Sequence, residues 1–66
     1  MKNSIKVERA KVDMTQQELA DKLQVSRQTI NAIEKGKFNP STLLALRIAR
    51  AFSVKVDDLF FLEEGD

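Results

Sequence analysis

Three adjacent polar residues near the middle of the chain, Arg27, Gln28 and Thr29, have side chains that can recognise the edges of base pairs. An arginine can form two hydrogen bonds to guanine, and a glutamine can form two to adenine. The methyl group of a threonine can contact the methyl group of thymine. The same three residues would also suit the solvated side of any helix. The elements that position them must therefore decide between the two interpretations.

The composition offers little for catalysis or metal binding. The 66 residues include no cysteine and no histidine, which removes disulfides and the common zinc ligand sets. The sequence also has no glycine-rich phosphate loop and no convincing carboxylate pair. A small enzyme is therefore the weakest of the function classes that we consider, and we expect neither a cofactor nor a metal site.

Capping signals predict two short helices around the three polar residues. Thr15 and Glu18 have the spacing of a capping box, so we expect a helix over about 16–23. Ser26 is a good N-cap for the next helix, over about 27–34. Only a tight turn fits between the two helices.

The rest of the chain is predicted to be helical as well. We expect a first helix over about 4–12, a fourth over about 42–52 after the N-cap Ser41, and a fifth over about 58–61 after Asp57. Glycine and proline are scarce, which favours an all-α chain. Ile5, Arg9 and Val12 are predicted on one face of the first helix. Three rings are expected in the core rather than stacked on bases: Phe38, Phe52 and Phe60.

Two short helices joined by a tight turn have the plan of a helix-turn-helix, whose second helix enters the major groove of DNA. Residues 15–36, TQQELADKLQVSRQTINAIEKG, resemble the helix-turn-helix of the lambda-repressor/Cro family, the Xre type. FNPS, LLALRIARAF and DDLF, further along the chain, resemble the later part of short stand-alone members. The resemblance implies a compact five-helix domain over residues 1–66. It also implies a sequence-specific transcriptional regulator that binds double-stranded DNA, and we favour a repressor.

The resemblance assigns roles to individual side chains. Arg27, Gln28 and Thr29 match positions that contact base edges at the start of the third helix. Asn31 lies one turn further on, where either a base or a phosphate can be contacted. The residues that match phosphate-binding positions are Gln16, Lys35, Lys37 and Asn39. Phosphate contacts set the register on DNA, whereas base contacts set the sequence preference.

Arg9 and Glu34 match an ion pair that, by the same resemblance, ties the first helix to the end of the third. The alternative is that the two are separate surface residues. Glu8 stands where many relatives carry an apolar residue, so the first helix is expected to be shifted or less buried.

The fourth helix carries two apolar stripes, although a surface helix usually needs one. Leu44 and Ile48 lie on the second stripe, which either enters a broad core or forms a dimer contact with Phe61 and Leu62. We expect a two-fold homodimer on a two-fold symmetric operator, because helix-turn-helix dimers read two half-sites. The resemblance to short members adds the option of a short terminal β-structure.

Charge is distributed unevenly along the chain. Residues 1–50 carry a balance of +5 and residues 51–66 a balance of −4, although the net charge is only +1. The basic part suits an anionic partner, and the acidic tail is expected to lie away from DNA. No apolar run approaches the roughly 20 residues of a membrane span, and no signal peptide opens the chain. We therefore expect no membrane contact and a cytoplasmic location.

One further function class stays open beside the regulator and the enzyme. An antitoxin-like protein would bind DNA and would also neutralise a partner protein. A toxin encoded next to this chain would favour that hypothesis, whereas the sequence has no long disordered arm that could wrap such a partner.

Overall fold

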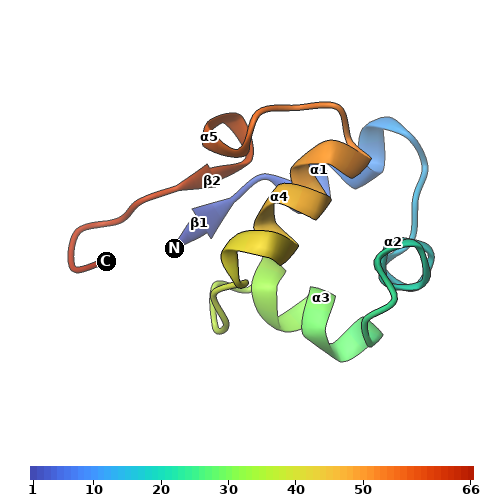
Figure 1. Ribbon diagram of the computed structural model, residues 1–66, viewed down its shortest axis with the longest axis horizontal. Helices are drawn as coiled ribbons and strands as arrows, with labels where there is room; N and C mark the ends of the chain where they lie inside the picture. The colour runs from blue at the N-terminus through green and yellow to red at the C-terminus, as the bar shows by residue number, and fades with distance from the viewer.

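The computed structural model describes residues 1–66 and contains five short helices and two very short strands. In chain order the elements are β1 (Lys2–Asn3), α1 (Ile5–Lys11), α2 (Gln16–Leu23), α3 (Arg27–Glu34), α4 (Thr42–Ala51), α5 (Val56–Leu59) and β2 (Phe60–Phe61). The strands pair at one end of the molecule, where both chain termini also lie (Figure 1). The predicted five-helix, lambda-repressor-like fold with a short terminal β-structure is confirmed. None of the helices has the length and apolar character needed to cross a membrane.

Side-chain caps start α2, α3 and α4 at the predicted residues. The Thr15 hydroxyl accepts from the Glu18 N–H at 3.0 Å, and the Glu18 carboxylate accepts from the Thr15 N–H at 2.9 Å. This bond from the Thr15 backbone lowers the pKa of Glu18 below its ordinary value. Ser26 and Ser41 each accept, at 3.1 Å, from the backbone N–H three residues further on. These local bonds satisfy donors that have no partner within the helix.

A left-handed residue follows each of the first four helices. At the end of α3, Gly36 has a φ of +73°, and the Gly36 and Lys37 N–H groups donate to the Ile33 and Ala32 carbonyls at 2.9 and 3.0 Å. This is the Schellman arrangement, which satisfies free carbonyls and turns the chain away from the helix axis. Three residues that are not glycine take the same conformation after α1, α2 and α4: Asp13, Gln24 and Ser53.

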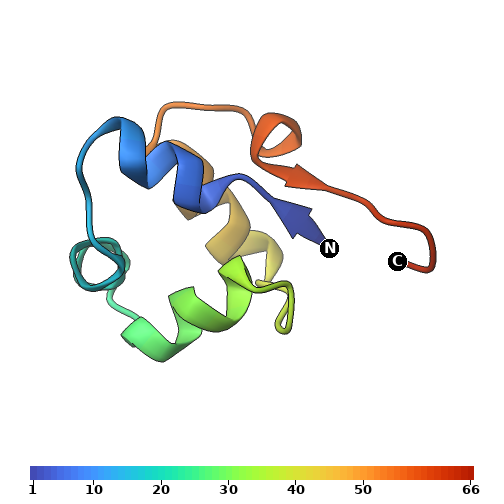
Figure 2. The same cartoon turned by 180° about the vertical axis from the view of Figure 1, so that it is seen from behind.

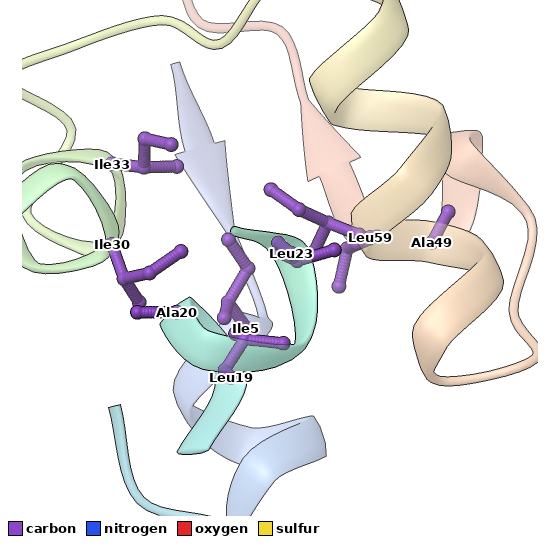
Figure 3. Close-up of a cluster of buried hydrophobic side chains, with 9 residues drawn as sticks. Ile5, Leu19, Ala20, Leu23, Ile30, Ile33, Ala49 and Leu59 are labelled. Carbon is purple, nitrogen blue, oxygen red and sulfur yellow. The ribbon is translucent and has the colours of Figure 1, made fainter. Parts of the chain in front are cut away.

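The core consists only of apolar side chains, and every helix contributes to it (Figure 3). Its nine buried residues are Ile5, Leu19, Ala20, Leu23, Ile30, Ile33, Ile48, Ala49 and Leu59. The three from α2 and the two from α3 pack these helices together, as the apolar spacing predicts. Burial on one side of α3 leaves its polar residues for the opposite side.

The fifth helix differs from its prediction. The sequence predicts a helix over 58–61 capped by Asp57, whereas α5 starts after Lys55 and has no side-chain cap. It ends at Leu59 because the next two residues form β2, which pairs antiparallel with β1 at the other end of the chain. This pairing joins the two ends of the sequence, so no local pattern near residue 60 could reveal it.

Two expectations about burial are wrong. Val12 lies beyond the end of α1 and is 58% exposed, although periodicity places it on the face of Ile5. Phe38 lies in the loop between α3 and α4 and is 50% exposed. The rings of Phe52 and Phe60 do pack against the core. The left-handed turn at the end of α1 explains the first difference, because the chain leaves the helix before Val12 could complete its face.

Candidate nucleic-acid interface

The predicted helix-turn-helix is formed by α2 and α3, which are joined by a turn of three residues, 24–26. Their apolar faces meet in the core, and this packing fixes the position of α3 relative to α2. The start of α3 lies at the outer edge of the molecule in both opposite views (Figures 1 and 2). The apolar face of α3 is therefore packed against the core, while its first turn projects from the domain.

Arg27 and Gln28 are exposed in that first turn, and neither side chain forms a hydrogen bond or ion pair within the protein. Thr29 is half-buried, and its hydroxyl lies 2.9 Å from the hydroxyl of the N-cap Ser26. The methyl group of Thr29 is the part of this side chain that can make an apolar contact. The three predicted base-reading residues thus lie together on one turn of helix.

Arg9 and Glu34 form the predicted ion pair. Arg9 Nε lies 2.7 Å from Glu34 Oε2, and Arg9 Nη2 lies 2.9 Å from Glu34 Oε1. The two side chains are only 13% and 8% exposed, respectively. Hydrogen bonding to Glu34 raises the pKa of the Arg9 guanidinium above its usual value. Arg9 Nη1 also donates to the Met14 carbonyl at 2.9 Å, so the pair joins α1 and the following turn to the end of α3.

Gln16 and Asn31, both half-buried, are connected to this ion pair. Gln16 Nε2 donates to Glu34 Oε1 at 3.2 Å, and Asn31 Nδ2 donates to Gln16 Oε1 over a longer distance of 3.4 Å. The sequence predicts a DNA contact for each residue, but it does not reveal the bond between them. Each amide keeps unused hydrogen-bonding capacity, because an amide offers two N–H donors and an oxygen acceptor.

An open polar groove of about 380 Å³ lies beside this network. Its lining contains no apolar side chain and comprises Asn3, Lys6, Arg9, Gln16, Asn31, Glu34 and Lys35. The groove carries three cations and one anion, so it suits a phosphate group. Lys6 is a residue of this groove that sequence reasoning missed. Its position three residues before Arg9, on the same helix face, is the signal that could have identified it.

The three predicted phosphate-binding residues that follow α3 do not all lie at this groove. Lys35 lines it, whereas Lys37 and Asn39 are exposed further along the loop. Between the two lysines, a Cβ on Gly36 would lie 3.3 Å from the Met1 carbonyl oxygen. The positive φ and this close approach explain why glycine stands here.

One residue of the acidic tail, Glu63, lies next to the end of α3. Glu63 lines a second small groove together with Lys35 and Gly36. Glu63 and Asp66 also lie 3.3 and 3.5 Å from the α-ammonium group of Met1. Glu63 therefore lies near Lys35, whereas the expectation that the tail lies away from DNA stays a prediction. Pairing between β1 and β2 brings the tail there.

The predicted dimer residues differ in exposure. Phe61 and Leu62 are exposed, Leu44 is half-buried, and Ile48 is fully buried in the core. Ile48 therefore cannot contact a second copy. The apolar stripe of α4 that contains Ile48 packs into the core instead. The exposed apolar residues of α4 are instead Leu43 and Leu46, at 68% and 52%.

An apolar groove of about 360 Å³ lies next to these exposed residues. Leu46 from α4 and Leu62 from the tail both line it, together with Val56 and Phe60. Exposed apolar groups around a groove are typical of a surface that contacts another molecule.

Known proteins resemble the chain over nearly its whole length. The model of a family described as helix-turn-helix matches residues 5–59. An uncharacterized HTH-type transcriptional regulator of Methanocaldococcus jannaschii is 54% identical over 66 residues, the whole of both chains. Another, of Bacillus subtilis, is 52% identical over 64 residues, 97% of each chain. One of Archaeoglobus fulgidus is 52% identical over 66 residues, all of this chain and 93% of its own. Members of the Xre-type helix-turn-helix family are DNA-binding transcriptional regulators and not enzymes. Because α2 and α3 form the helix-turn-helix and these comparisons match it, the chain belongs to this family.

Proposed function

We propose that residues 1–66 act as a single domain that binds a specific double-stranded DNA sequence as a cytoplasmic homodimer and represses transcription. The observation that carries this proposal is that Arg27 and Gln28, on the first turn of α3, are exposed and form no hydrogen bond or ion pair within the protein. In helix-turn-helix proteins the second helix lies in the major groove with its N-terminal residues on base edges. Repression is the simpler outcome, because occupancy of a promoter is sufficient for it.

Base recognition is assigned to the first two turns of α3. Arg27 would bond to guanine, Gln28 to adenine, and the Thr29 methyl group would contact thymine. Asn31 would contact a base one turn further on. The Thr29 hydroxyl also bonds to the Ser26 hydroxyl at 2.9 Å, which holds the side chain of Thr29 in place.

Phosphate binding is assigned to residues on both sides of α3. Gln16 and Lys6 would bind one phosphate at the polar groove, with Lys35 on the same groove. Lys37 and Asn39 would bind further along the backbone from the exposed loop. Such contacts supply affinity that falls with salt and hold α3 in register.

The homodimer is assigned to four exposed apolar side chains: Leu43 and Leu46 of α4, Phe61 of β2 and Leu62 of the tail. The half-buried Leu44 would contribute beside them. A second copy related by a two-fold axis would cover these side chains and place two recognition helices on one duplex. Two half-sites, about 34 Å apart, would then supply the specificity that one small domain lacks.

Selection of bound duplexes from a random pool tests the DNA assignment, and sedimentation equilibrium tests the dimer. We expect a two-fold symmetric consensus and a dimer at micromolar concentration. Phe61→Glu should shift the protein toward monomer, whereas Val7→Glu, at an exposed apolar residue of α1, should not. An unenriched pool would reject sequence-specific binding. A monomer bound to asymmetric single sites would reject the dimer alone.

A further inference from the structure

A chain of hydrogen bonds runs from the Arg9–Glu34 pair to the proposed base-contacting residue Asn31. Glu34 Oε1 accepts from both Arg9 Nη2 and Gln16 Nε2, at 2.9 and 3.2 Å. An ionised carboxylate can only accept hydrogen bonds, so Gln16 must direct its NH2 group at Glu34. The Gln16 oxygen is consequently the atom left for Asn31, and Asn31 Nδ2 donates to it.

The same reasoning fixes the amide of Asn31. With this amide reversed, Asn31 Oδ1 would face Gln16 Oε1, and two acceptors would meet without a hydrogen between them. Asn31 therefore uses Nδ2 toward the protein. Its Oδ1 has no hydrogen-bond partner in the structure and is the acceptor that remains for a ligand.

The amide of Gln28, on the first turn of α3, provides a contrast. It has no bond within the protein, so nothing there determines which of its ends meets the DNA. The polarity of Asn31 is instead determined by a residue that need not touch DNA.

We propose that Glu34 is a positioning residue that determines the base preference at the base pair contacted by Asn31, and that it acts through Gln16. This proposal rests on the proposed function. A free acceptor selects a base with an amino group in the major groove, which is N6 of adenine or N4 of cytosine. Guanine and thymine present the acceptors O6 and O4 there and are disfavoured.

Glu34→Gln is the most direct test, because glutamine keeps the size of the side chain and can still accept from Arg9. It offers both an oxygen and an NH2 group, so Gln16 is no longer held in one orientation. The base pair that Asn31 contacts is first located with Asn31→Ala. Glu34→Gln should then reduce the preference for adenine or cytosine at that pair about five- to tenfold. Preferences at the Arg27 and Gln28 pairs should stay unchanged.

Glu8→Gln is the matched control. It changes the charge of the protein by the same amount, but Glu8 pairs with Lys11 at 3.0 Å and lies outside the hydrogen-bond chain. Its effect on preference at the Asn31 pair should be nil, and any change in salt dependence from lost charge should match that of Glu34→Gln.

Gln16→Met removes the connecting amide and leaves the Arg9–Glu34 pair intact, so it decides the matter if Glu34→Gln fails to fold. It should weaken binding to all sequences, because a phosphate contact is lost, and should reduce the preference at the same pair. Combined with Glu34→Gln, it should cause no further loss of preference there.

Two results would overturn the proposal while the wild type still selects a sequence. One is an unchanged preference at the Asn31 pair in both variants. The other is an equal loss at every base pair, which would make Glu34 a structural residue only. Failure of the wild type to select any duplex would instead reject the proposed function itself.

Discussion

The first and second halves of α3 hold their polar side chains in opposite ways. In the first turn, Arg27 and Gln28 are exposed and have no partner in the protein. In the last turns, Asn31 and Glu34 belong to a hydrogen-bond chain that reaches α2 and α1. Free side chains lose conformational entropy when they bind, whereas bonded ones have lost it already on folding. Under the proposed function, the residues that set sequence specificity are therefore independent of folding stability in the first half of α3 and coupled to it in the second half.

The two halves also differ in what holds the helix. The start of α3 is fixed by Ser26, its neighbour in the sequence. The end is fixed by Arg9, which lies on α1 and is 25 residues away from Glu34. A local cap positions the backbone and leaves the side chains free, while a tertiary ion pair positions the side chains themselves.

The largest effect is expected where the helix is held by the ion pair. Arg9→Ala or Glu34→Ala leaves one charge of a largely buried pair without its partner, so each should lower the free energy of unfolding by about 3–5 kcal/mol. Urea melts measure this loss. Glu8→Ala breaks a pair whose lysine is 64% exposed, so it should cost less than about 1 kcal/mol. A comparably small loss for Arg9 and Glu34 would mean that the two halves of α3 do not differ in stability.

In the first turn, the same truncation should affect recognition and not folding. Arg27→Ala and Gln28→Ala should each lose about 1–3 kcal/mol of discrimination at one base pair. Their urea melts should match those of the wild type, because both side chains are exposed and neither forms a hydrogen bond or ion pair within the protein. Competition binding with single-base variants of the selected duplex measures the discrimination. Wild-type preference in both variants would show that this turn does not contact bases.

The cap at the start of α3 should have an intermediate effect. Ser26→Ala removes the acceptor for the Thr29 N–H and should cost about 1 kcal/mol of stability. Ser41→Ala removes the equivalent cap of α4 and serves as the control, since its cost should be similar. Only Ser26→Ala should also change preference at the Thr29 base pair, because it frees the Thr29 hydroxyl. Equal preference in the two variants would argue against a fixed Thr29 contact.

The smallest effects are expected for the lysines around α3. Lys6→Ala, Lys35→Ala and Lys37→Ala should each flatten the slope of log affinity against log salt by about one unit. Base preference should stay the same, because phosphates carry no sequence information. Lys55→Ala, at the start of α5, should leave the slope unchanged. A shifted preference with the wild-type slope would move that lysine to the base-contacting group.

Much of the local structure follows from residues close together in the chain. Thr15 and Glu18, Ser26 and Ser41 determine where three helices start, and Gly36 determines where α3 ends. These signals are readable because each bond joins residues at most five positions apart. The segment from 15 to 36 also suffices to predict the helix-turn-helix, whose family the comparisons confirm.

Sequence by itself therefore determined the first four helices and the polar character of α3, while the tertiary structure decided which side chains are buried and which of them meet. Ile48, which the sequence leaves between the core and a dimer contact, is buried in the core. Phe38, which is predicted in the core, is exposed. Lys6 reaches the polar groove, and Gln16 bonds to Glu34, only because α1, α2 and α3 converge there. Burial depends on which surfaces the packed helices bring together, and no short-range pattern contains that information.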